Sequence, residues 1–312
     1  MLTYLFPGQG AQQEGYLRRL HEQAAFKETL DEASHILDLD ILTLDTPDAL
    51  RSTVAVQVGL VVAGVATVRA LAAEHIEPDI SAGLSVGAYP AAVSSGALAF
   101  DDALRMVRRR AELMETAWPS GYGLAAIAGL SEHQVEKLAH DHQHDGHTPV
   151  YIANVNAPRQ IVMAGSDAAL DAFIARALAA GARKATRLAV SVPSHCVLLA
   201  KASEELLAYA KDIKFRAPLG TYIGNRGGRP LHTADAIRDD LATNMRYTVR
   251  WYDALTAMIE MGGRVLIEAP PGQVLSDITR EAFPDVTVVA ASSMAFDRLV
   301  ATIRRRTGAD GG

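Results

Sequence analysis

The stretch that decides the fold is "SAGLSVGAY", residues 81–89. It follows a short apolar run, precedes a segment of helical period and fits the pattern G-x-S-x-G. The two glycines permit a sharp turn from a strand into a helix, which lifts the serine oxygen to the end of a sheet. The pattern can arise by chance in a chain with 24 glycines. The strand and helix on either side favour a nucleophile at Ser85.

Outward from this turn, short apolar runs alternate with longer segments of helical period. This alternation is typical of a parallel sheet covered by helices, so we expect an α/β fold. The expected strands are 3–6, 80–84, 221–224, 265–268 and 286–290. The expected helices include 101–116, 196–210 and 249–261.

The middle of the chain predicts a different arrangement. Segments 124–129, 132–140, 150–155, 161–165, 167–180 and 185–190 follow the order strand, helix, strand, strand, helix, strand. This β-α-β-β-α-β order is that of ferredoxin-like domains. We therefore expect a small ferredoxin-like domain at 121–194, inserted into a large α/β domain made of 1–120 and 195–312.

Composition narrows the classes of function. The 312 residues carry a net charge of −6, so there is no basic excess for nucleic acid or a membrane surface. One cysteine, Cys196, allows no internal disulfide and fits a reducing compartment, so we expect a cytoplasmic protein. The apolar run 54–68 includes Gln57 and is shorter than the roughly 20 residues that a bilayer needs. We expect a buried helix there and a frayed tail at 304–312.

A serine nucleophile needs a base, because its hydroxyl is weakly nucleophilic at neutral pH. The chain has ten histidines. His195, in "SVPSHCVLL", follows a predicted strand and Pro193 and opens a predicted helix of the large domain, where it can face the end of the sheet. The alternative at such a position is a helix cap or a surface histidine.

Histidines are densest at 140–147, "HDHQHDGH". The segment suggests either a metal site or a solvated loop. It has neither cysteine partners nor an H-E-x-x-H pattern, and it lies in a predicted polar loop. We therefore expect no metal there.

An arginine occupies an unusual place in the helix "DDALRMVRRRAELME", residues 101–115. At 100° per residue, Arg110 falls in the centre of the apolar stripe, whereas Arg108 and Arg109 fall outside it. A buried guanidinium must be paired or must serve a ligand. The sequence leaves two alternatives open, an internal salt bridge and a fork for a substrate carboxylate.

Over nearly its whole length, the chain resembles the malonyl-CoA to acyl-carrier-protein transacylases. The motifs "FPGQGAQ", "GLSVGAY", "RRRAELM", "NVNAPRQIVMAG", "VSVPSHC" and "EAPPGQVL" occur in the family's order. The resemblance implies an α/β-hydrolase-like parallel-sheet core with the ferredoxin-like insert. It also implies Ser85 as nucleophile and His195 as base in a ping-pong malonyltransferase that needs no metal or other cofactor.

The resemblance assigns four more residues. It implies that Arg110 binds the malonyl carboxylate and that the backbone N–H groups of Gln9 and Val86 form the oxyanion hole. Matching "LATNMRYTVRW" implies that the backbone carbonyl of Asn244 orients the histidine. Malonyl-CoA and an acyl carrier protein are the implied partners.

Three departures narrow the choice within the family. Leu84 and Ala88 stand where fatty-acid-synthesis members carry His and Glu, and Pro270 replaces a glycine. This combination resembles the epsilon subunit of malonate decarboxylase. We therefore expect transfer to a carrier with a phosphoribosyl-dephospho-CoA arm, with other decarboxylase subunits as partners. The alternative is a transacylase of fatty-acid or polyketide synthesis.

Two alternatives belong to other classes. A serine esterase shares G-x-S-x-G, but its chemistry has no use for Arg110 and it would place its histidine near the C-terminus, after an acid. A non-catalytic subunit that only docks a carrier protein has no use for an intact set of Ser85, His195 and Arg110.

Overall fold

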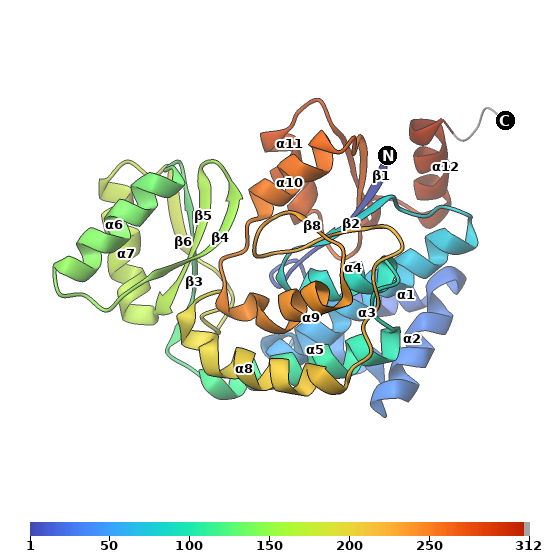
Figure 1. Ribbon diagram of the computed structural model, residues 1–312, viewed down its shortest axis with the longest axis horizontal. Coiled ribbons are helices and arrows are strands. Elements are labelled where there is room, and N and C mark those ends of the chain that lie inside the picture. Colours follow the sequence, from blue (N-terminus) through green and yellow to red (C-terminus); the bar gives the residue numbers. More distant parts are fainter. Residues whose placement is uncertain (309–312) are drawn as a thin grey trace.

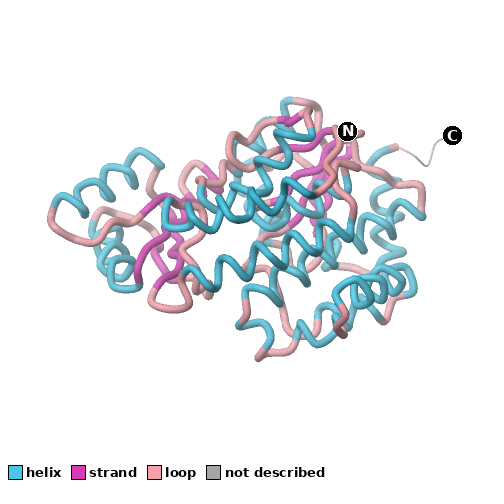
Figure 2. The backbone as a smooth tube through the Cα atoms, turned by 60° about the horizontal axis from the view of Figure 1, so that its bottom comes forward, coloured by secondary structure: helices cyan, strands magenta, loops and turns pink. Residues whose placement is uncertain are grey.

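The chain folds into two sheets that lie side by side, each with its own helices (Figure 1). The computed structural model describes residues 1–308. The large sheet has the order β10-β9-β1-β2-β7-β8, in which all neighbours are parallel except β7 and β8. The small sheet is antiparallel, with the order β4-β5-β3-β6. Figure 2 shows the strands as two separate groups with helices outside them.

The large-sheet strands are β1 (Leu2–Phe6), β2 (Ile80–Gly83), β7 (Thr221–Ile223), β8 (Pro230–Leu231), β9 (Val265–Glu268) and β10 (Thr287–Ala290). Five of them were expected from the sequence, and each end lies within one residue of its expected place. Every residue of β1, β2 and β9 is buried. Strands covered on both faces form continuous apolar runs, which explains the agreement.

The helices of the large unit are α1 (Tyr16–His21), α2 (Ala24–Leu37), α3 (Thr53–Ala73), α4 (Ala88–Ser94), α5 (Phe100–Ala117), α8 (Ala200–Tyr209), α9 (Ala234–Thr243), α10 (Trp251–Glu260), α11 (Val274–Ala282) and α12 (Phe296–Thr307). Two expected helices begin late. A 3-10 turn, Val197–Leu199, precedes α8. The segment before α10 pairs with the small sheet instead of continuing the helix.

The apolar run 54–68 lies within α3, which packs against α2 and α5. The Ser52 side chain caps this helix by accepting hydrogen bonds from Val54 N and Ala55 N. By length and composition α3 could cross a membrane, but 83% of its most apolar window is buried inside the fold. The expectation of a buried helix is confirmed.

The small unit consists of β3 (Tyr122–Ala128), α6 (Glu132–His144), β4 (Tyr151–Ala157), β5 (Gln160–Ser166), α7 (Asp167–Ala179) and β6 (Lys184–Arg187). This is the element order that the sequence predicts. One face of the sheet packs on α6 and α7, and the other packs on Val190 and Cys196. The last strand is shorter than expected, because the chain leaves the sheet after Arg187. The domain limits at 121 and 194 stay a prediction.

Main-chain hydrogen bonds join the two units. Val249 N donates to Ala153 O and Val155 N donates to Val249 O, both at 2.9 Å, so Val249 lies beside β4 as a short extra strand. One residue later, Arg250 forms an ion pair with Glu132 of α6. The small sheet is thus fixed to the segment that precedes α10.

The C-terminal helix corrects another expectation. We expected 304–312 to be frayed, but α12 continues to Thr307, and Arg304 forms an ion pair with Glu74 at 3.0 Å. Residues 309–312 of the expected tail lie outside the described residues.

Candidate active site

Ser85 lies in a 3-10 turn, Ser85–Gly87, between β2 and α4. Its φ of +57° is in the left-handed region, which residues other than glycine rarely adopt. A Cβ on Gly83 would collide with the backbone of Gly87, and one on Gly87 would collide with the carbonyl oxygen of Phe6. Only glycine fits at both places, so the turn is as tight as the sequence pattern predicts.

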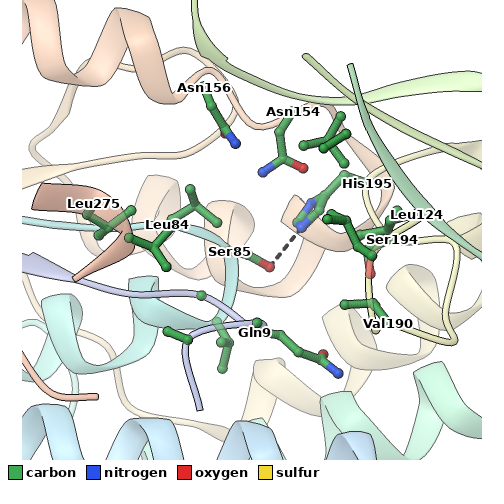
Figure 3. A pocket seen from close by; sticks show the side chains of 18 of the residues that line it. Gln9, Leu84, Ser85, Leu124, Asn154, Asn156, Val190, Ser194, His195 and Leu275 are labelled. Atoms are coloured by element: carbon green, nitrogen blue, oxygen red, sulfur yellow. Dashed lines mark hydrogen bonds between the residues drawn. The ribbon is translucent and has the colours of Figure 1, made fainter. Parts of the chain in front are cut away.

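His195 lies next to this serine, and both side chains line one cavity (Figure 3). Its Nε2 lies 2.7 Å from Ser85 Oγ, and its Nδ1 lies 2.8 Å from the Asn244 carbonyl oxygen. His195 N also donates to Met245 O at 2.7 Å. The sequence predicts that His195 opens a helix, and this prediction is wrong. The residue lies in a loop with a φ of +65°.

The protonation state of this histidine follows from its surroundings. Burial, and next the charge of Arg110, lower the pKa of His195 from 6.5 to about 4. The ring is therefore neutral near pH 7. Because the Asn244 carbonyl can only accept, it holds the proton on Nδ1 and leaves the lone pair on Nε2, toward Ser85. This is the form that can take a proton from the serine.

Arg110 is fully buried in α5, as its place in the apolar stripe predicts. Its Nη1 donates to Gln57 Oε1 at 2.6 Å. Its Nη2 donates to Ser85 Oγ at 3.2 Å and to Asn244 Oδ1 at 3.1 Å. No carboxylate pairs with it within residues 1–308. The salt-bridge alternative is therefore wrong, and a buried cation with only neutral partners remains beside the serine.

A cavity of about 270 Å³ lies between the ends of the large-sheet strands and the small sheet. The loop after β1 forms one wall. A Cβ on Gly8 would lie 2.9 Å from Leu84 O, so this loop presses against the serine turn. Gln9 and Val86, the two predicted oxyanion donors, both line the cavity with Ser85 and His195.

Two carboxamides in the cavity were not predicted. Asn154 and Asn156 are buried on β4, and both side chains point into the cavity (Figure 3). Asn156 Oδ1 has no hydrogen-bond partner. Polar residues two apart on an otherwise apolar strand share one face, and this spacing in "NVNAP" was the available signal.

Two further residues near the serine were missed. Asn225, which follows β7, accepts a hydrogen bond from Ser85 N at 2.8 Å, and Asp240 of α9 accepts one from Asn225 N at 2.9 Å. A polar residue soon after a strand of a parallel sheet predicts, as a weak signal, a place at the carboxyl edge of that sheet, where Ser85 lies. No local pattern in the sequence connects either residue with Ser85.

The histidine-rich segment takes no part in this site. His140, His142 and His144 lie on α6 rather than in the expected loop, because α6 continues to His144. His140, His144 and His147 are exposed, and the buried His142 stacks on His147 with ring centroids 4.5 Å apart. In the described part of the chain, no three His, Cys, Asp or Glu side chains are grouped so that they could hold a metal ion.

Comparison with known proteins gives a consistent result. Residues 3–310 match the family model described as an acyl transferase domain. The malonyl CoA-acyl carrier protein transacylase of Escherichia coli K12 is 36% identical over 294 residues, 92% of this chain and 94% of the relative. The crystal structure of an acyl-carrier-protein S-malonyltransferase from Burkholderia pseudomallei has a TM-score of 0.90 and 35% identity, covering 96% of this chain and 99% of its own. A malonyl-transacylase in complex with a type II polyketide synthase acyl-carrier protein has a TM-score of 0.90 and 31% identity, covering 98% and 99%.

Proposed function

Because the chain belongs to the acyl transferase domain family, we propose that this acyltransferase moves a malonyl group from malonyl-CoA to the thiol of an acyl carrier protein. The observation that carries the proposal is Arg110, a buried cation without a carboxylate partner, 3.2 Å from the oxygen of Ser85. A hydrolase of neutral esters has no use for such a charge. A substrate that brings its own carboxylate offsets the cost of burying it.

The first half-reaction begins at the 2.7 Å contact between Ser85 Oγ and His195 Nε2. The histidine takes the hydroxyl proton while Oγ attacks the thioester carbon. We expect the N–H groups of Gln9 and Val86 to hold the oxyanion, a contribution of about 3 kcal/mol per donor. The C–S bond then breaks, and the CoA thiolate takes the proton from His195 as it leaves. A malonyl-serine ester remains.

The second half-reaction uses the same groups in reverse. The carrier thiol gives its proton to His195, and its sulfur attacks the ester carbon. The bond to Ser85 Oγ breaks, and the serine recovers the proton. Each step needs only side chains and backbone groups of the chain, so we expect neither a metal nor another cofactor. The cytoplasmic location stays part of the proposal.

The guanidinium of Arg110 is prepared for the malonyl group. Its Nη2 donates to Ser85 Oγ and Asn244 Oδ1. Once Oγ becomes an ester oxygen it is a poorer acceptor, and the malonyl carboxylate can replace it. Charge-assisted bonds of this kind are the stronger ones in proteins. An acetyl group would leave the guanidinium without this partner.

The carboxamides of Asn154 and Asn156 suit the rest of the substrate. CoA and the prosthetic arm of a carrier protein both present amide groups along an extended chain. Carboxamides in a cavity can accept from and donate to such amides, and a substrate that left Asn156 Oδ1 without a partner would bind at a cost. CoA in the first half-reaction and the carrier's prosthetic arm in the second can therefore bind to the same two carboxamides.

The proposed malonyl transfer could belong to either of two pathways, fatty-acid or polyketide synthesis or malonate decarboxylation. Relatives named for malonyl transfer to acyl carrier protein favour fatty-acid or polyketide synthesis over malonate decarboxylase. The decarboxylase epsilon subunit is kept as the second candidate because of Leu84, Ala88 and Pro270. Of these, Leu84 lines the cavity next to Ser85, so it is the departure with direct access to the substrate.

Two measurements test the proposal. Intact-protein mass spectrometry after mixing with malonyl-CoA should show one malonyl adduct on Ser85, and no adduct would reject malonyl transfer. Purified carrier proteins should then be offered to the malonyl-enzyme, one with a phosphopantetheine arm and one with a phosphoribosyl-dephospho-CoA arm. Faster transfer to the first supports fatty-acid or polyketide synthesis, and faster transfer to the second supports the decarboxylase role.

A further inference from the structure

The serine turn has an unfavourable backbone that something outside it must hold. Ser85 adopts a φ of +57°, a conformation that is unfavourable for a residue other than glycine. It persists only where surrounding contacts fix it. Within the turn, Gly87 N donates to Leu84 O at 3.0 Å and Ala88 N donates to Ser85 O, and neither bond involves the Ser85 N–H. The Ser85 N–H is therefore held by a contact from another element.

The side chain of Asn225 provides two of these contacts. Its Oδ1 accepts from Ser85 N at 2.8 Å, and its Nδ2 donates to Gly83 O at 2.9 Å. One planar carboxamide thus bonds to the backbone on both sides of Leu84. The side chain is buried, so water does not compete for either bond.

Asn225 is itself held by a buried carboxylate. Asp240 Oδ1 accepts from Asn225 N at 2.9 Å and from Arg226 N at 3.3 Å, and Oδ2 accepts from Tyr222 O–H at 2.9 Å. On its other side, Asn225 O accepts from Arg250 N at 2.9 Å. Burial raises the pKa of Asp240 to about 6, so the carboxylate is ionised near pH 7 and its three donors offset the burial.

We propose that Asn225, held by Asp240, is a positioning residue that fixes the backbone of Ser85 so that Oγ points to His195 Nε2. The proposal rests on the proposed function in one respect, that Ser85 is the nucleophile. Asn225 does not line the cavity, so it acts through Ser85 and not on the substrate. Its loss should therefore slow the chemical step and leave substrate affinity nearly unchanged.

The test compares Asn225→Ala and Asn225→Asp with a control, Thr67→Val. The alanine variant loses both bonds to the turn. The aspartate variant keeps an acceptor for Ser85 N but places an oxygen against Gly83 O. The control removes another buried hydrogen bond, from Thr67 Oγ1 to Ala63 O at 2.8 Å, at a residue that does not line the cavity. It shows what a general loss of stability does to activity.

Three readouts are needed. The first is the rate of labelling of Ser85 by a fluorophosphonate, which reports the reactivity of the serine without any malonyl group. The second is kcat and KM for malonyl-CoA. The third is hydrogen exchange of the Ser85 amide. In Asn225→Ala we expect labelling and kcat to fall by about ten- to a hundredfold, the cost of a misplacement near 1 Å. KM should change less than about twofold, exchange should accelerate, and Asn225→Asp should be intermediate.

The outcomes separate the two proposals. If Asn225→Ala labels as fast as Thr67→Val, Asn225 is a structural residue only and the positioning role is wrong. If wild type labels rapidly but takes no malonyl group, malonyl transfer is wrong and the positioning role stands on the labelling and exchange data. If wild type is not labelled, Ser85 is not an activated nucleophile and both proposals fail.

Discussion

Two regions of the sequence are rich in potentially reactive side chains, the surroundings of Ser85 and residues 140–147. They differ in whether these side chains lie close together in the fold. Around Ser85, the polar groups come from segments far apart in the chain, yet Arg110, His195 and Asn225 each place an atom within 3.2 Å of the serine oxygen or its backbone nitrogen. In residues 140–147, the titratable groups are adjacent in sequence, yet most of them face solvent. Convergence in space, and not density along the chain, distinguishes a site.

The histidine-rich region has a structural explanation. In the last turn of α6, the buried His142 stacks on His147 and packs edge-on against Phe173 of α7. Next to it, Asp145 forms an ion pair with Arg176 of α7 at 2.5 Å. The segment therefore serves to end α6 and to attach it to α7.

The largest expected effect is at the serine. Ser85→Ala removes only the hydroxyl oxygen that forms the ester, so we expect complete loss of the malonyl adduct with the fold retained. Intact-protein mass spectrometry measures the adduct, and circular dichroism measures the fold. An adduct that persists in the folded variant would place the nucleophile elsewhere and remove the basis of the comparison.

Loss of the base should be next in size. His195→Ala should slow acylation by about a hundredfold or more, the usual contribution of a general base. In wild type, the pKa of His195 is lowered to about 4, so the histidine is neutral above that pH. kcat/KM for malonyl-CoA should therefore stay level as the pH falls through 6.5 and decline only toward 4. A decline centred at 6.5 would show that the histidine is not buried as described.

Arg110 should change the choice of acyl group. Arg110→Ala should lower kcat/KM for malonyl-CoA by roughly ten- to a hundredfold, equivalent to the 1.5–3 kcal/mol of a charge-assisted bond, and spare acetyl-CoA. Arg110→Lys should rescue only in part, because an ammonium cannot reproduce the planar fork. The ratio of kcat/KM for the two thioesters is the measurement. An equal fall for both would make Arg110 a structural residue.

A smaller effect is expected at the neutral partner of that arginine. Gln57→Glu keeps the shape of the side chain but gives Arg110 an internal carboxylate, so the malonyl preference should fall by about tenfold. Because the Arg110 charge helps to lower the pKa of His195, the acid limb of kcat/KM should also move to higher pH. Gln57→Met serves as the uncharged control. A variant with full malonyl preference would show that the charge of Arg110 is not what selects the substrate.

The smallest effect is expected in the histidine-rich region. Replacing His140, His144 and His147 together by Ala should leave acylation unchanged within about twofold, because these exposed side chains lie outside the cavity. Zinc should bind the wild type no more tightly than the triple variant in isothermal titration. A stoichiometric zinc site lost in the variant would overturn the contrast between the two regions.

Local patterns predicted much of the framework. The buried strands of the large sheet are apolar runs bounded by turn residues, so their ends were placed within one residue. The two glycines around Ser85 predict a tight turn. Arg110 and Gln57 are each a polar residue in an apolar segment, and the sequence alone shows this. These signals lie within one element, where the periodicity of the sequence is informative.

Contacts between distant segments could not be predicted in this way. The helix expected at 249–261 begins late because Val249 pairs with β4, almost a hundred residues away. Asn225 and Ser85 are 140 residues apart, and no repeat or spacing connects them. Gln57 and Arg110 each stand out as a polar residue in an apolar segment. Their hydrogen bond could not be predicted, because it depends on how α3 packs on α5. His195 was found through the motifs around it, whereas its left-handed backbone was not.

The segment from Asn244 to Arg250 limits where the chain can gain or lose residues. Its first residue binds His195 Nδ1, Val249 pairs with β4, and Arg250 N donates to Asn225 O. The number of residues between these three anchors sets their separation, and one residue of extended chain spans about 3.3 Å. A single insertion or deletion would move at least one anchor out of hydrogen-bond reach. Length differences among relatives should therefore fall in the surface loops and not in these seven residues.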